Sequence, residues 1–154
     1  VSNSFGVDIP GNRKLNNLQK EKRFKIFHQT YHKNLSNLIK RKAEKFKKII
    51  LISIHSFTKN PHNLDRGIEV GLLWNKNMNI LLHVQRRLIE KKIHFGRNYP
   101  YSGFFYNYTL DRHSKDGLID NLSIEIRNDL ICSKKGIKKY VEIFANLFGE
   151  LIND

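Results

Sequence analysis

The sequence predicts an α/β fold in which a sheet is flanked by helices, and two observations carry this prediction. Apolar runs typical of strands lie at 49–54, 68–74 and 122–127. Segments whose apolar residues recur at helical spacing lie at 15–46, 77–91 and 135–152. Strands that alternate with helices along a chain are typical of α/β sheets.

The first third of the chain is expected to hold a long helix and then a buried strand. The helix is expected over 15–46, with a break inside it. One of its faces is expected to carry residues at 3-4-4 spacing, which are Phe27, Tyr31, Leu35, Leu38 and Lys42. The strand "IILISI", 49–54, is a continuous apolar run of the kind that is buried on both faces in an α/β sheet.

The middle of the chain is expected to hold a strand, a helix and a short strand. The strand reads "IEVGLLW", 68–74, and Asn75 or Asn77 is expected to cap the helix that follows at 77–91. A short strand is expected near 93–95. The apolar face of the helix is expected to consist of Ile80, Leu81, Val84 and Leu88.

A long segment, "GRNYPYSGFFYNYTLDRHSKDG", is expected to be a loop. Loops of this length inside a compact domain are uncommon and are usually functional or disordered. The strand "LSIEIR" follows, in which Leu122, Ile124 and Ile126 point one way while Ser123, Glu125 and Arg127 point the other. This alternation fits a half-exposed strand with a polar outer face. It also fits a carboxylate held at the edge of a sheet beside a metal, as a general base.

Length and composition indicate one domain over residues 1–154. Hydrophobic residues make up 40% of the chain, and no apolar run has the length of a membrane span. The first residues lack the apolar core of a signal peptide. The one cysteine, Cys132, is compatible with a reducing compartment. We therefore expect a cytoplasmic protein that does not bind membranes.

The net charge of +14 raises the alternative of nucleic-acid binding. Lysine, asparagine and isoleucine, which share A/T-rich codons, are all abundant, so the charge first reflects composition. Lysine outnumbers arginine, the residue preferred for bidentate phosphate contacts, by about two to one. The densest basic run, "KRKAEKFKK" at 40–48, fits a solvated helix face. Nucleic-acid binding is therefore the least favoured function.

Polar residues at strand ends and in long loops are the candidates for chemistry. They are His55 with Ser56, the 96–113 loop, and Glu125 with Arg127. In open α/β sheets, ligands bind outside the carboxyl ends of the strands, where distant residues converge. His28 and His32 have the spacing of a zinc protease motif, but Gln29 stands where that motif has glutamate, which favours a solvated helix face.

The order of motifs resembles a known family. "SIHSF" followed far downstream by "IEIR" resembles the zinc carboxypeptidase architecture, and the complete series resembles the N-formylglutamate amidohydrolase family, which is related to it in fold. The resemblance covers nearly the whole chain. The matching segments are "IPGN" (9–12), "KRFKIFHQTYH" (22–32), "SIHSFT" (53–58), "RGIEVGLLWN" (66–75), "NYPYSG" (98–103), "YTLDRH" (108–113) and "IEIRNDLI" (124–131).

The resemblance implies a zinc-exopeptidase-like (phosphorylase/hydrolase-like) fold with a mixed sheet, and hydrolysis of a linear amide such as N-formylglutamate. It implies that His55 is a zinc ligand and that Glu125 is the catalytic base. The two carboxylates of such a substrate need fixed cations, for which Arg66, Arg127 and Arg23 are the candidates, in that order. Tyr101, Ser102 and His113 are candidate donors to the substrate or to the oxyanion.

The resemblance also implies missing parts. Members of the family carry an upstream portion with the first two metal ligands, and this chain begins after it, with Val1. We therefore expect a fold incomplete at its N-terminus, a truncated or split gene product, and an isolated chain that is nearly inactive. A separate N-terminal chain is one expected source of the missing ligands. The alternative function is a non-catalytic remnant or binding module with the same fold.

For nucleic acid, we expect duplex DNA to bind no more tightly at physiological salt than non-specific contacts do, which is a Kd of about 10⁻⁴ to 10⁻⁶ M. The reason is that dispersed lysines neutralise phosphates without reading bases. Fluorescence anisotropy over a series of salt concentrations measures this, and a tighter Kd would contradict the interpretation of the charge.

Overall fold

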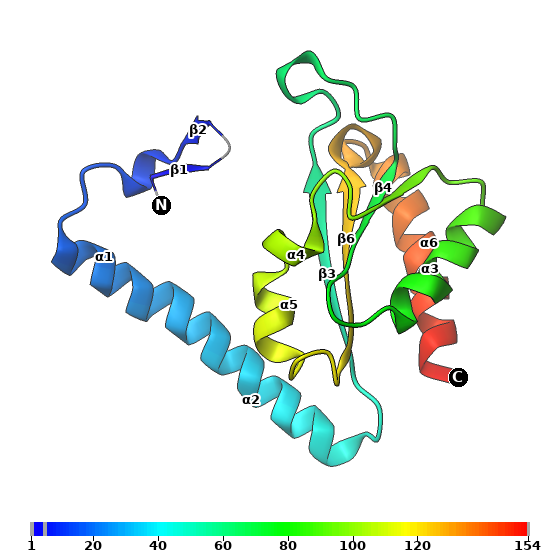
Figure 1. Ribbon diagram of the computed structural model, residues 1–154, viewed down its shortest axis with the longest axis horizontal. Coiled ribbons are helices and arrows are strands. Elements are labelled where there is room, and N and C mark those ends of the chain that lie inside the picture. Colours follow the sequence, from blue (N-terminus) through cyan, green and yellow to red (C-terminus); the bar gives the residue numbers. More distant parts are fainter. Residues whose placement is uncertain (1, 5, 154) are drawn as a thin grey trace. The chain divides into compact units, whose positions relative to one another are not determined.

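The computed structural model describes residues 2–4 and 6–153 (Figure 1). The chain divides into two compact units, Val1–Lys48 and Ile49–Asp154, and each is described by itself. The single domain predicted from the sequence stays a prediction. Within the described residues, no helix combines the length and the apolar character needed to cross a membrane.

The first unit is a short hairpin followed by a continuous helical segment. The helix begins with a capping box, in which Asn16 and Gln19 each accept a hydrogen bond from the other's backbone N–H. The predicted helix is confirmed, and the expected break is a π-helical segment, a rare geometry that appears mostly as single turns inside helices. The elements are β1 (Asn3–Ser4), β2 (Val7–Asp8), α1 (Asn17–Arg23), the π-helical segment Phe24–Gln29 and α2 (Thr30–Lys45).

The second unit is a four-stranded mixed sheet with helices on both faces, as predicted. The strand order is β3-β6-β4-β5, with β3 parallel to β6, β4 antiparallel to β6, and β5 parallel to β4. Helices α3 and α6 cover one face, and α4 and α5 lie at the other (Figure 1). The elements are β3 (Ile50–Phe57), β4 (Val70–Leu73), α3 (Asn79–Glu90), β5 (Phe95–Arg97), α4 (Gly103–Tyr106), α5 (Tyr108–His113), β6 (Asp120–Arg127) and α6 (Lys134–Asn153).

The burial of the two long strands is the reverse of the prediction. The apolar run predicts that β3 is buried on both faces, but the strand pairs only with β6 among the described residues, and Ile54 is 51% exposed. Alternation in β6 predicts a half-exposed polar face, but every residue from Asn121 to Ile126 is buried. The reason is position in the sheet, since β6 lies between β3 and β4 while β3 is an edge strand.

The predicted long loop is wrong because two short helices lie within it. Ser102 accepts a hydrogen bond from the backbone N–H of Phe104 (3.3 Å) and so caps α4. Asn107, between α4 and α5, donates from its side-chain amide to the carbonyl of Leu73 (3.2 Å). Helices of four and six residues are marginal alone. Their contacts with the sheet therefore stabilise them.

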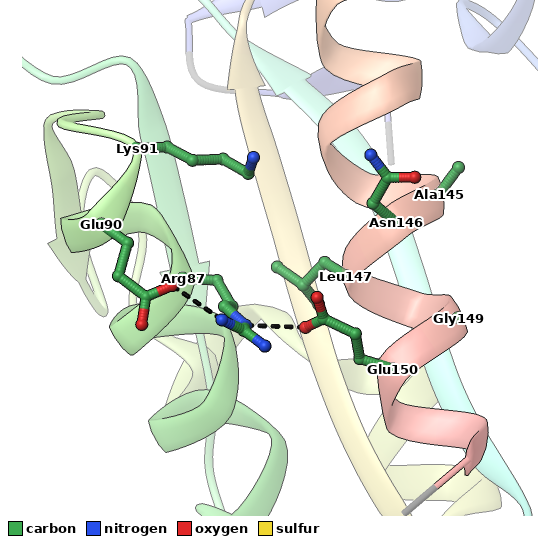
Figure 2. Close-up of a pocket in the computed structure, with 8 residues that line it drawn as sticks. All are labelled: Arg87, Glu90, Lys91, Ala145, Asn146, Leu147, Gly149 and Glu150. Carbon is green, nitrogen blue, oxygen red and sulfur yellow. Dashed lines mark hydrogen bonds and ion pairs between the residues drawn. The ribbon is translucent and has the colours of Figure 1, made fainter.

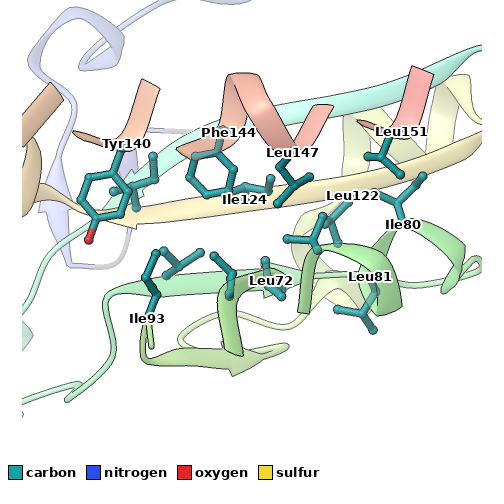
Figure 3. Close-up of a cluster of buried hydrophobic side chains, with 14 residues drawn as sticks. Leu72, Ile80, Leu81, Ile93, Leu122, Ile124, Tyr140, Phe144, Leu147 and Leu151 are labelled. Carbon is teal, nitrogen blue, oxygen red and sulfur yellow. The ribbon is translucent and has the colours of Figure 1, made fainter. Parts of the chain in front are cut away.

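The core lies on one face of the sheet, between apolar side chains of the strands and those of α3 and α6. Leu72 on β4 and Ile124 on β6 are register partners, so both project from this face. Figure 3 shows them with the buried side chains of α3 and α6. The predicted apolar face of α3 is confirmed, since Ile80, Leu81, Val84 and Leu88 are all buried. Asn77 precedes this helix and accepts a hydrogen bond from the backbone N–H of Asn79 (2.9 Å).

Two leucines of α3 test this description of the core by the same substitution. We expect Leu88→Ala, at a fully buried position, to lower the free energy of unfolding by about 2–5 kcal/mol, because it removes apolar contacts and leaves a cavity. Leu82, on the same helix, is 51% exposed, and Leu82→Ala is expected to change the free energy of unfolding by about 0.5 kcal/mol or less. Urea unfolding measures both values, and equal losses would contradict the assigned helix orientation.

Candidate active site

The parallel pairing of β3 and β6 places a histidine beside a glutamate. His55 and Glu125 are register partners in neighbouring parallel strands, so their side chains project from the same face of the sheet. Adjacent strands lie about 4.8 Å apart. The expected placement on one sheet is therefore confirmed, although His55 lies inside β3, two residues before its end, rather than at its end. Their face is opposite to the one that carries the apolar core.

Glu125 is a buried carboxylate whose hydrogen bonding is incomplete. The residue is only 7% exposed, and its Oε2 atom is buried without a hydrogen-bond partner among the described residues. Burial raises the pKa of the Glu125 carboxyl above 4.5, and electrostatic interactions with His55 and Arg66 oppose this shift. A carboxylate with a raised pKa accepts a proton more readily near neutral pH, which suits a general base.

A glycine on the other neighbouring strand lets a loop approach Glu125. Gly71 on β4 is the antiparallel register partner of Glu125. A Cβ atom at Gly71 would lie 2.6 Å from the carbonyl oxygen of Tyr99 and 3.2 Å from the Cβ of Glu125. Any side chain at this position would therefore displace the loop. An isolated glycine in the strand "IEVGLLW" is the sequence signal for such an approach, and it is absent from the residues predicted above for the site.

Arg66 is held near Glu125 by the loop between β3 and β4 and by Tyr101. Its Nη1 donates to the carbonyl of Thr58 and to the hydroxyl of Tyr101, both at 3.1 Å. Its guanidinium carbon lies 4.9 Å from the ring centroid of Tyr101 and 5.7 Å from that of Phe57. The structure thus brings together four of the residues predicted from the sequence, which are His55, Arg66, Tyr101 and Glu125.

The two other candidate arginines are engaged elsewhere. Arg127 forms two hydrogen bonds with the carboxylate of Asp129 and one with the carbonyl of Ile68, and the pairing lowers the pKa of Asp129. Arg23 lies in the first unit and donates to the side chain of Asn12 (2.7 Å). It lines a hollow of about 980 Å³ in that unit. Their roles in substrate binding stay predictions.

Ser102 precedes the first of the two short helices, and His113 is the last residue of the second. Ser102 is the residue that caps α4, so its hydroxyl accepts from the backbone of the helix. His113 ends α5 and is buried, and burial together with the nearby Arg112 lowers its pKa. Both lie in the segment that covers the Glu125 face of the sheet. Donation from either of them to a substrate stays a prediction.

Among the described residues, the side chains of the candidate site fall short of the ligand set of a catalytic zinc ion. Catalytic zinc normally takes three protein ligands and leaves a position for water. His55 is the residue of this site predicted to bind zinc. Across residues 2–4 and 6–153, no group of three or more histidine, cysteine, aspartate or glutamate side chains is arranged to hold a metal ion. The residues described here therefore do not complete a zinc site by themselves.

Comparison with known proteins identifies the family. The model of the N-formylglutamate amidohydrolase family matches residues 3–132. The chain belongs to this family. This match confirms the predicted family resemblance. In a separate comparison, no curated protein matches the chain.

Two solved structures are similar to this family member. A gene product of Agrobacterium tumefaciens is 26% identical with a TM-score of 0.89, over 99% of this chain and 61% of that one. The N-formylglutamate amidohydrolase of Ralstonia eutropha is 23% identical with a TM-score of 0.62, over 88% of this chain and 51% of that one, which shows the fold alone. The chain thus spans less than two thirds of the length of either protein.

A separate hollow between α3 and α6 is not part of this site. It has a volume of about 620 Å³ and lies on the core side of the sheet, whereas Glu125 faces the other side. Figure 2 shows that Arg87, at its centre, pairs with Glu90 and Glu150. Arg87 and Lys91 are matched in number by the carboxylates of Glu90 and Glu150, so the lining offers no excess of positive charge to an anionic substrate.

The pKa of Glu125 predicts that removing its charge stabilises the fold. Because the folded state holds the proton of Glu125 more tightly than the unfolded state does, protonation of this carboxyl stabilises the fold. This stabilisation is complete below pH 4.5 and is lost as pH rises through the pKa of the folded state. We therefore expect Glu125→Gln to have a higher Tm than the natural protein at pH 7. The difference should shrink as pH falls through the raised pKa of the folded state and be smallest below about 4.5. Differential scanning calorimetry across pH 3–8 measures it, and a lower Tm at pH 7 would contradict the burial argument.

Glu69 is the matched control, with the opposite sign. Its burial is outweighed by hydrogen bonds from the hydroxyl of Tyr140 (2.8 Å) and the backbone N–H of His94 (3.2 Å), so its pKa is lowered. This stability is present above pH 4.5 and is lost as pH falls through the lowered pKa. Glu69→Gln is therefore expected to lower the Tm at pH 7, in the same experiment.

Proposed function

We propose that this chain contributes to a zinc-dependent hydrolytic site for a linear amide such as N-formylglutamate, which is split into glutamate and formate. The observation that carries the proposal is the pairing of His55 with Glu125 on one face of the sheet, in a member of this family. Ligands of open α/β sheets bind at the carboxyl ends of strands, and both residues lie in the last part of their strands.

Glu125 is the proposed general base. It takes a proton from the water whose oxygen attacks the formyl carbon. It then passes this proton to the amine nitrogen as the C–N bond breaks. The raised pKa of Glu125 supports both transfers, because a carboxylate that holds its proton more tightly is a better acceptor at neutral pH.

Arg66 is the proposed partner of a substrate carboxylate. Among the described residues its two hydrogen bonds both use Nη1, which leaves Nε and Nη2 to a bidentate contact. Arg127 and Arg23 follow Arg66 as candidates, because Arg127 is already paired with the carboxylate of Asp129, and Arg23 lies in the first unit, where it donates to Asn12. Tyr101, Ser102 and His113 are the proposed donors to the substrate or to the oxyanion.

The remaining zinc ligands are proposed to come from further polypeptide, either an upstream portion or a separate N-terminal chain. His55 would hold zinc together with these further ligands, and the bound ion would supply polarisation of the amide carbonyl and a water whose pKa is lowered to about 7. The outer edge of β3 supports this proposal, because it has no partner strand within residues 2–4 and 6–153. A strand added there would lie next to His55. An acyl-amino acid as substrate and a cytoplasmic location complete the proposal.

The alternative function is a non-catalytic remnant or binding module of the same fold. The observation that favours it is the incomplete donor set, because no group of three or more histidine, cysteine, aspartate or glutamate side chains in the described part of the chain could hold a metal ion. The two proposals differ in whether supplied ligands restore zinc and turnover, because a remnant would keep the sheet without regaining either.

We expect the 154-residue chain alone to bind no stoichiometric zinc and to hydrolyse N-formylglutamate barely at all. Joining it to the upstream portion of a longer family member, in cis or as a separate chain, is expected to restore about one zinc per site and turnover. In that restored protein, Glu125→Gln should keep zinc and lose about 10²–10⁴-fold in kcat, the usual contribution of a general base. Atomic absorption and formate release measure these quantities.

His55→Ala in the restored protein is expected to lose the metal itself. His94, an exposed histidine of the same unit, and Glu142, an exposed glutamate of α6, provide the controls. His94→Ala and Glu142→Gln should keep both zinc and turnover. Stoichiometric zinc and steady turnover by the isolated chain would show that the ligands are misassigned. A restored protein without zinc would favour the remnant.

A further inference from the structure

Asn98 connects the residue after β4 to the first residue of α4 through a single side-chain oxygen. Its Oδ1 accepts hydrogen bonds from the backbone N–H groups of Trp74 and Gly103, both at 2.9 Å. Its own backbone N–H donates to the carbonyl of Leu72 (2.8 Å). Trp74 follows β4, and Gly103 begins α4. Asn98 therefore ties both ends of the segment 99–102 to the end of β4.

Two glycines allow this segment to lie directly on β4. A Cβ atom at Gly103 would collide with the backbone of Trp74, and one at Gly71 would collide with the carbonyl of Tyr99. The segment is thus in contact with the strand near both of its ends. Neither contact leaves room for a side chain, so the position of the segment is closely determined by the backbone of β4.

Tyr101 connects this segment to the candidate site, because it contacts Arg66. Tyr101 lies in the middle of the segment, and its hydroxyl and ring both contact the guanidinium group of Arg66. Gly71, under the first part of the segment, is the register partner of Glu125. A shift of the segment would therefore move Tyr101 away from Arg66.

We propose that Asn98 is a positioning residue, whose side-chain oxygen holds the segment 99–102 on β4 so that Tyr101 keeps Arg66 beside Glu125. The purpose of this arrangement, to present Arg66 to a substrate carboxylate, rests on the proposed function. The arrangement itself rests on contacts within this chain.

Asparagine meets two requirements at position 98. The side chain must accept two N–H groups, and the backbone has a φ of 46°, in the left-handed region that asparagine and aspartate tolerate better than most residues. Aspartate keeps both properties. Glycine keeps the backbone and loses the acceptor. The pair Asn98→Asp and Asn98→Gly therefore separates the role of the acceptor from the role of the backbone.

The experiment uses NMR on the 154-residue chain without metal or substrate. The Nε–H resonance of Arg66 reports its position over the Tyr101 ring, and the amide exchange rates of Trp74 and Gly103 report the two hydrogen bonds. In Asn98→Gly we expect the Arg66 resonance to lose its ring-current shift. We also expect both amides to exchange about 5-fold faster or more, as for the loss of a typical hydrogen bond. Asn98→Asp is expected to retain the natural values of all three.

Asn77 provides the matched control. It is half-buried, it accepts from the backbone N–H of Asn79, and it donates to the carbonyl of Gly117 and to Asp120, at the opposite end of β6 from Glu125. Asn77→Gly is expected to lower the Tm and to leave the Arg66 resonance in place. An equal displacement of Arg66 in Asn77→Gly would reduce the role of Asn98 to general stability and overturn the proposal.

Tyr101→Phe tests the last link without altering Asn98. It is expected to shift the Arg66 resonance, because it removes the hydroxyl that accepts from Nη1, while the exchange of Trp74 and Gly103 stays unchanged. Natural values for all three signals in Asn98→Gly would overturn the proposal. These measurements need neither zinc nor turnover, so a failure of the proposed function would leave their outcome intact, and the reverse also holds.

Discussion

The in-register parallel pairing of β3 with β6 is the constraint on which the rest of the second unit depends. Side chains alternate between the faces of a strand, so a slip of one residue would turn His55 away from Glu125. The same register directs Leu122 and Ile124 toward α3 and α6. One alternation therefore builds the core on one face and the candidate site on the other.

The apolar core offsets the free energy that the burial of Glu125 costs the fold. Glu125 is buried, and its Oε2 has no hydrogen-bond partner in the described part of the chain, an arrangement that opposes folding when the carboxylate is charged. The apolar cluster on the opposite face stabilises the strand that carries it. Groups held at such a cost are typical of functional sites, where a perturbed pKa serves chemistry rather than stability.

The strand β4 organises the polar side of the sheet without contributing a charged side chain there. Gly71 leaves the space through which the loop passes beside Glu125, and Gly103 brings α4 against the end of β4. Arg66 then reaches the same region from the other side, held by Tyr101. The chain thus supplies a carboxylate, an imidazole and a guanidinium group on one face. The outer edge of β3, which has no partner strand in the described part of the chain, lies next to them.

The sequence by itself determined the class of the fold and the order of its main elements, and it singled out His55 and Glu125, the two residues that the fold places side by side in the candidate site. These follow from local periodicity and from motifs that each lie within a few residues. Burial was decided by neighbours, since alternation in β6 does not reveal that it is central, and the apolar run of β3 does not reveal that it is an edge. Helices α4 and α5 are too short to show periodicity, and their capping and sheet contacts form only in the fold. The contacts of Arg66 and Arg127 were decided by tertiary structure for the same reason, because a long charged side chain pairs with whichever groups the folded chain brings within its reach.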